Sequence, residues 1–248
     1  MVVRRRIARF AVATSLVGLV IARAASSGPP GDNDPQIAAL ERAVTDNPED
    51  LHSCADYRQL MIASGNYDRA IKLLERLADR PRSGPNVHIS LALAYVDKVP
   101  VASAFRRIFL GQDAMRALSK AIDREPSLVA YYIRGLIALY YPEALFHRAR
   151  GGMTDLEHAH RLLAGVTMLP AHARVYVSLG DGYWKIHDLA RAVSTWKDGL
   201  NRFPADADLR ARLTNHGADL DRIVEHALDP ATRVDTSLQE LFAAAPAP

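Results

Sequence analysis

One stretch of this chain constrains its fold more than any other, because its large apolar, small and turn-forming residues recur at helical spacing. The stretch reads Tyr176-x2-Leu179-Gly180-x2-Tyr183-x8-Ala192-x3-Trp196-x2-Gly199-x4-Pro204. Residues three and four positions apart lie on one face of an α-helix, and a proline ends such a pattern. The spacing therefore predicts two amphipathic helices joined by a short turn within 176–204.

This pattern resembles the 34-residue tetratricopeptide repeat, in which Trp, Leu, Gly, Tyr, Ala, Phe, Ala and Pro recur at fixed positions. The resemblance extends more weakly over about 36–204. It implies an all-α fold, an α-solenoid of stacked antiparallel helix pairs with about four units and capping helices at both ends. It also implies a scaffold that holds other molecules and usually catalyses nothing.

The N-terminus has the pattern of an export signal. Four arginines precede an uncharged, mostly apolar run of thirteen residues from Phe10 to Ala22, and Ala22-Arg23-Ala24 offers the small residues of a cleavage site. The run is shorter than the roughly 20 residues of a membrane-spanning helix. We expect a signal peptide over 1–24, or an uncleaved anchor as the alternative, followed by a flexible linker over 25–35.

The leader also explains the basic character of the chain. The whole sequence carries 31 basic and 28 acidic residues, a net charge of +3, with a pI of about 9.1. Five of the arginines and none of the acids lie in 1–24, so the remainder has 26 basic and 28 acidic residues, a net charge of −2. This balance gives no reason to expect nucleic-acid binding. The single cysteine, Cys54, excludes an intrachain disulfide and is typical of a small core residue.

Repeat-like segments divide the chain into units. We expect a capping helix at 35–46, helix pairs beginning near 51, 86, 127 and 173, and a final helix to about 228 that is broken or bent near Gly217. The solenoid then covers 36–228, and 229–248 forms a tail with one short helix near 238–244. Arg58 stands where the repeat pattern has a small residue, which predicts looser or shifted packing in the first unit.

Two of the units carry extra residues near 100–110 and 142–150, and we expect both to lengthen second helices at the same end of the stack. Either the apolar residues of the two extensions cover each other, or they form a docking surface for a partner, a second copy or a membrane. These residues are Phe105, Ile108, Phe109, Leu145 and Phe146.

The resemblance places the first helix of each unit along a concave groove. It implies groove positions at Tyr132, Leu136, Tyr140, Arg174, Asp181, Trp184 and Lys185. Relatives that hold a C-terminal carboxylate use a set of Lys, Asn and Arg here, and that set is missing. The groove is apolar and aromatic in its middle and charged toward its C-terminal end, which suits a peptide or a helix.

The chain lacks a local catalytic signature. Its nine histidines are dispersed, and Glu157-His158-x-His160 does not have the i, i+4 spacing of a zinc helix. Neither a phosphate-binding glycine loop nor a G-x-S-x-G nucleophile motif occurs. We therefore expect no catalytic residue, no metal site and no cofactor.

These observations favour an exported, non-enzymatic scaffold that binds a protein or peptide in its groove. The composition of the leader suggests the bacterial periplasm, with the protein soluble after cleavage or anchored to the inner membrane by the leader. One alternative is a periplasmic carrier of a small molecule or lipid. Another is an enzyme that uses the histidine-rich third unit. The partner and the oligomeric state stay open.

Overall fold

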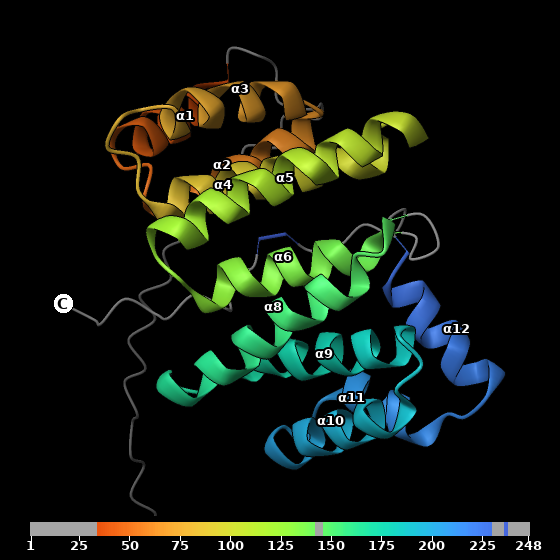
Figure 1. Ribbon diagram of the computed structural model, residues 1–248. Helices are drawn as coiled ribbons and strands as arrows, with labels where there is room; N and C mark the ends of the chain where they lie inside the picture. The colour runs from red at the N-terminus through yellow and green to blue at the C-terminus, as the bar shows by residue number, and fades with distance from the viewer. Residues whose placement is uncertain (1–33, 142–145, 230–235, 238–248) are drawn as a thin grey trace, which may run out of the picture.

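The computed structural model describes residues 34–141, 146–229 and 236–237, and the regular structure in these ranges is helical (Figure 1). The α-helices are α1 (Pro35–Asp46), α2 (Leu51–Ser64), α3 (Tyr67–Ala78), α4 (Pro85–Lys98), α5 (Ala104–Arg124), α6 (Leu128–Tyr140), α8 (Ala149–Leu162), α9 (Ala173–Lys185), α10 (Leu189–Arg202), α11 (Ala207–Thr214) and α12 (Ala218–Ala227). Short 3-10 turns are η1 (Val99–Val101), η2 (Leu163–Gly165) and η3 (Pro170–His172).

The helices stack as antiparallel pairs: α2 with α3, α4 with α5, α6 with α8, and α9 with α10. The contacts are most extensive within the last three pairs. The pairs succeed one another from α1 at one end to α10 and α11 at the other, and α12 turns back along one side (Figure 1). The predicted α-solenoid of four units with capping helices is confirmed, and α1 spans the predicted residues 35–46.

Polar side chains fix where many of these helices begin. An oxygen that accepts a hydrogen bond from a first-turn N–H satisfies a donor that the helix itself leaves unpaired. The residues that do so are Asp34, Asp50, Ser103, Ser127, Asp188 and Asp206. The helix predicted to end near 228 is divided into α11 and α12 at Gly217, whose φ of 55° favours glycine.

The strongest repeat unit closes around a glycine. A Cβ added to Gly180 would lie 2.1 Å from the indole nitrogen of Trp196, so only glycine lets α9 and α10 approach this closely. Trp196 is fully buried, and its indole N–H donates to the carbonyl of Val177 at 3.4 Å. A Cβ on Gly152 would likewise meet the Gly135 carbonyl of α6 at 2.8 Å, whereas Gly151 faces open space.

The two predicted extensions have different outcomes. The first lengthens α5, which begins at Ala104 and runs for 21 residues, although Pro100 lies in the preceding 3-10 turn. The second does not continue α8, which begins only at Ala149. His147 interrupts the helical path with a positive φ of 49°, so the predicted continuous extension over 142–150 is wrong at this point.

Several predictions fall outside the described residues. The leader at 1–24, the linker up to residue 33, the segment 142–145 and the short helix near 238–244 are among them. Among the helices in the described ranges, none is both long and apolar enough to cross a bilayer.

Candidate functional site

A pocket of about 300 Å³ lies where the first helices of three units come together. Helices α4, α6 and α9 supply most of its wall, and α11, the end of α12 and Thr236 line it as well. The apolar part of the wall comprises Leu93, Val96, Ile133, Leu136, Ile137 and Val177. The pocket therefore opens onto the face that the repeat register assigns to binding.

Five of the seven predicted groove residues line this pocket: Tyr132, Leu136, Tyr140, Arg174 and Asp181. They come together because helix pairs that stack side by side turn the same helix face in one direction. Their part in binding a partner stays a prediction.

Trp184 and Lys185 lie at the end of α9 and are not part of the pocket wall. The indole N–H of Trp184 donates to Asp221 of α12 at 3.2 Å. The Lys185 ammonium donates to the carbonyl of Leu139 and, at 3.0 Å, to that of Tyr141. Lys185 thus satisfies carbonyl groups at the C-terminal end of α6, which a cation stabilises.

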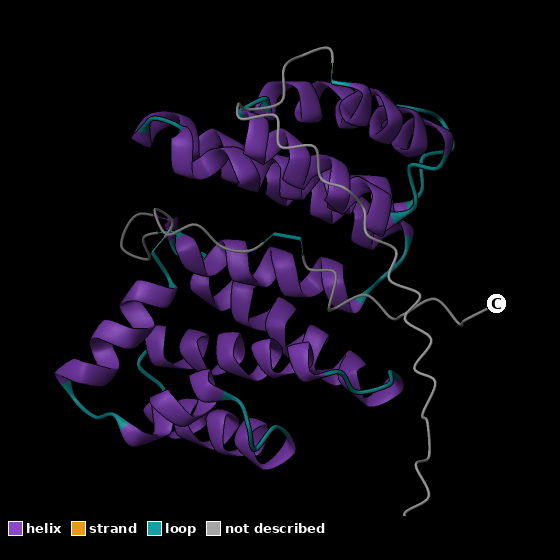
Figure 2. Cartoon of the chain, turned by 180° about the vertical axis from the view of Figure 1, so that it is seen from behind, coloured by secondary structure: helices purple, strands orange, loops and turns teal. Residues whose placement is uncertain are grey.

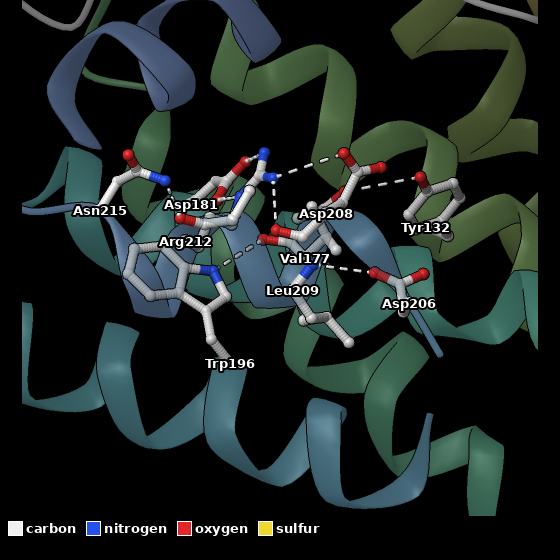
Figure 3. A network of polar contacts seen from close by, with 11 residues as sticks. Tyr132, Val177, Asp181, Trp196, Asp206, Asp208, Leu209, Arg212 and Asn215 are labelled. Atoms are coloured by element: carbon white, nitrogen blue, oxygen red, sulfur yellow. Dashed lines mark hydrogen bonds and ion pairs between the residues drawn. The ribbon is translucent and has the colours of Figure 1, made fainter. Parts of the chain in front are cut away.

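An ion pair between α9 and α11 lines one end of the pocket. Arg212 of α11 donates through Nε and Nη2 to the two carboxylate oxygens of Asp181, each at 2.6 Å, and both side chains are buried (Figure 3). Burial raises the pKa of the Asp181 carboxyl, and the hydrogen bonds from Arg212 oppose that effect. Burial also disfavours charge on Arg212, but the bonds and charge of Asp181 prevail and raise the pKa of the guanidinium.

The two tyrosines of α6 that line the pocket differ in what their hydroxyls contact. Tyr132 is buried, and its hydroxyl accepts a hydrogen bond from Ser178 at 3.4 Å. Tyr140 is half-buried, and its burial raises the pKa of the phenol. The Tyr140 hydroxyl has no hydrogen bond to another described residue, so it can bond to a ligand in the pocket.

A second buried ion pair lies beyond the α4 end of the pocket, and sequence reasoning missed it. Arg58 of α2 is 1% exposed, and its Nη1 donates to Asp97 of α4 at 2.7 Å. Its Nη2 donates to the carbonyl of Thr236 at 2.7 Å, while the Thr236 hydroxyl donates to the other oxygen of Asp97. Arg58 therefore does not loosen the packing but joins three segments. The signal in the sequence was an arginine at a buried repeat position, because a buried arginine needs an acidic side chain to pair with.

The apolar residues of the extended α5 stay largely in solvent. Phe105 is 72% and Phe109 is 40% exposed, and their rings contact each other edge to face. The α5 segment meets the next unit through Tyr141, whose hydroxyl donates to the Ile108 carbonyl and whose ring contacts Phe146. Leu145 lies outside the described residues. Docking on this surface stays a prediction.

The histidines of the third unit engage neighbouring rings. His158 stacks on Tyr131 with ring centroids 4.9 Å apart, and His160 contacts Tyr176 edge to face. Within residues 34–141, 146–229 and 236–237, no group of three or more metal-ligating side chains comes together. Cys54 is buried, and burial raises the pKa of its thiol to about 11, which disfavours the reactive thiolate.

Comparison with known proteins agrees with this architecture. A tetratricopeptide repeat family model matches residues 37–94, which span α1 to most of α4. The helical stack has the fold of tetratricopeptide-repeat proteins. The matched segment is not the 176–204 stretch from which the family resemblance was first inferred, so two separate parts of the chain carry the repeat pattern.

Solved tetratricopeptide-repeat structures have the same overall fold. A thermophilic TPR protein from Thermus thermophilus is 22% identical, with a TM-score of 0.54 over 71% of this chain and 86% of that one. MamA is 19% identical, with a TM-score of 0.47 over 67% of this chain and 85% of that one. No curated protein sequence matches the chain.

Proposed function

We propose that this tetratricopeptide-repeat protein is an exported, non-enzymatic scaffold that binds a segment of another protein in its concave groove. Proteins of this fold bind protein partners and generally act as scaffolds. The observation that carries the proposal is the pocket between α4, α6 and α9, which combines an apolar wall with an available phenol hydroxyl.

The pocket suits one anchoring part of a protein segment. Its volume of about 300 Å³ lies at the lower end of the range of about 300–1,000 Å³ for small-molecule sites. Leu136 and its apolar neighbours favour an apolar side chain. The hydroxyl of Tyr140 can both donate to and accept from a peptide main chain. The rest of the partner segment would extend along the first helices.

The groove is tested by comparing two substitutions that each remove one phenol hydroxyl. Tyr140→Phe alters the pocket, whereas Tyr95→Phe removes a hydroxyl that donates to Glu75 at 2.7 Å and is not part of the pocket wall. Tagged full-length protein is crosslinked in native envelopes, and captured proteins are quantified by mass spectrometry. We expect Tyr140→Phe to reduce capture of a stoichiometric partner several-fold, since a lost hydrogen bond costs about 1 kcal/mol.

A stronger variant, Leu136→Arg, places a charge in the apolar wall and should abolish capture. Its matched control is Leu189→Arg, because Leu189 is exposed on α10. Circular dichroism verifies that each variant folds. If a specific partner is captured equally by the wild-type protein, Tyr140→Phe and folded Leu136→Arg, the pocket is not the binding site.

A carrier of a small molecule or lipid is the second candidate, because the chain's own C-terminal elements line one side of the pocket. Leu228 and Ala227 at the end of α12 and Thr236 contribute to the wall. A carrier purified gently from its host should show a retained ligand in native mass spectrometry. A mass equal to that of the polypeptide alone counts against this function.

The proposed location is the bacterial periplasm, and it rests on the composition of residues 1–24. Cleavage after Ala24 would release a soluble protein, and an uncleaved leader would hold the scaffold at the inner membrane. N-terminal sequencing of the protein recovered from cell fractions distinguishes these two states. Recovery of the uncleaved protein in the cytosolic fraction would contradict export.

A further inference from the structure

We propose that Arg58 and Asp97 form a recognition site for an extended peptide segment that carries a threonine or serine. In the resting protein, Thr236 of the chain's own C-terminal region occupies this site. The inference rests on the proposed function, because it names the chemistry selected at one end of the same concave groove.

The geometry of the pair favours one kind of residue. The Arg58 guanidinium uses Nη1 for Asp97, and Nη2 donates to the carbonyl of Thr236 at 2.7 Å. The remaining oxygen of Asp97 accepts from the hydroxyl of that same threonine. One residue is therefore recognised through both its main-chain acceptor and its side-chain donor. Serine retains both groups, whereas valine has the shape of threonine but no hydroxyl.

The site is incomplete without an occupant. Arg58 is 1% and Asp97 6% exposed, and a buried ion pair is stable only when its remaining donors and acceptors are also satisfied. Thr236 satisfies one group on each partner. The Arg58 Nε is also buried and has no hydrogen bond to any described residue, so the guanidinium has a further donor for a ligand.

The occupant comes from a distant part of the chain. Thr236 lies 178 positions after Arg58 and 139 after Asp97, and it also lines the pocket. The segment 236–237 lies beside α6 when seen from either side of the molecule (Figures 1 and 2). Residues 236 and 237 lie outside the helices of the repeat units. A partner segment that offers the same two groups would compete with Thr236.

The test measures binding of a fluorescent peptide with the sequence of residues 230–241 to the full-length protein by anisotropy. The wild-type protein should bind it weakly, because Thr236 competes from within the chain. Thr236→Val in the protein should strengthen binding about fivefold, as expected when the internal competitor loses one hydrogen bond. In the peptide, Val in place of the residue matching Thr236 should weaken binding about fivefold, and Ser should not. A peptide with Val at the position of Thr232 is the matched control and should bind unchanged.

Asp97→Ala, added to the Thr236→Val protein, should greatly reduce the preference for the threonine peptide, because alanine offers the threonine hydroxyl no partner. The ratio of threonine-peptide to valine-peptide affinity is also measured on the wild-type protein, so the test does not depend on a variant that folds. Equal affinities for the two peptides overturn the inference. If the threonine preference holds but Tyr140→Phe leaves partner capture unchanged, the proposed pocket function fails while this recognition site stands.

Discussion

Two buried arginine–aspartate pairs lie at opposite ends of the concave face, and they are built differently. Arg212 binds both oxygens of Asp181, so a single guanidinium satisfies the whole carboxylate. Arg58 binds one oxygen of Asp97 and leaves the other to Thr236. The first pair is complete within neighbouring helices, whereas the second needs a third segment.

This difference indicates separate roles for the two ends. The Asp181–Arg212 pair attaches the end-capping α11 to α9 and thereby closes the stack, as a repeat array requires. The Arg58–Asp97 pair connects α2 to α4 and also holds a residue that belongs to neither repeat. The Asp181–Arg212 pair therefore stabilises the fold, whereas the Arg58–Asp97 pair serves the proposed recognition of a peptide.

The largest effect is expected from Asp181→Asn. The amide introduced at position 181 would replace one acceptor oxygen with an NH2 group, which faces an N–H of Arg212. The buried guanidinium would then lose one of its two hydrogen bonds to residue 181. Breaking a buried ion pair costs about 3–5 kcal/mol, and we expect a loss of free energy of unfolding in that range. Urea unfolding followed by circular dichroism measures it. A loss below about 1 kcal/mol would show that this pair does not lock the end of the stack.

Acid should weaken the N-terminal part through His88, which shares α4 with Asp97. Burial, together with the charges of Arg124 and Lys120, lowers the pKa of His88 to about 4 from an ordinary 6.5. Between these two pH values the unfolded chain binds a proton that the folded chain does not. The stabilisation is complete above pH 6.5 and is lost as pH falls toward 4, by up to about 3 kcal/mol.

Unfolding of the wild-type protein and of His88→Leu at pH 7.5 and pH 4.5 measures this contribution. Other groups titrate in both proteins, so only the difference between the two pH dependences is interpreted. His88→Leu should lose less stability on acidification than the wild-type protein. Equal losses would exclude His88 as the source.

Asp97→Asn should cost less than Asp181→Asn, although both carboxylates are buried. At position 97 the two oxygens have different partners, so the amide oxygen can still accept from Arg58 while the amide N–H donates to the Thr236 hydroxyl. We expect a loss of about 1–2 kcal/mol, measured by the same urea unfolding. A loss equal to that of Asp181→Asn would remove the distinction between the two ends.

Thr236→Val should have the smallest effect, about 1 kcal/mol, because it removes one hydrogen bond and keeps the shape of the side chain. Combined with Asp97→Asn in a double-mutant cycle, it should show a coupling energy of at least about 0.5 kcal/mol, as expected of residues in contact. Combined with Asp181→Asn, the two losses should add. If the losses in free energy of unfolding add in both cycles, the contribution of Thr236 to stability does not depend on Asp97.

Much of the candidate site follows from the register of the repeat. Tyr132, Leu136 and Tyr140 lie on one face of the first helix of the third unit, and helix stacking turns that face toward the groove. The ends of the elements were harder to predict. The backbone before α8 turns at His147, and the hydrophobic periodicity of the sequence does not predict the positive φ of this residue.

The sequence by itself determined the helix pairs, their order and the concave face, because helical spacing and the glycine against Trp196 are local properties. Only the tertiary structure decided which charges meet. Arg58, Asp97 and Thr236 are separated by up to 178 positions, so their contact depends on how the whole solenoid brings its end back over the first units. A repeat pattern describes neighbours along the stack and carries no information about a segment that crosses it.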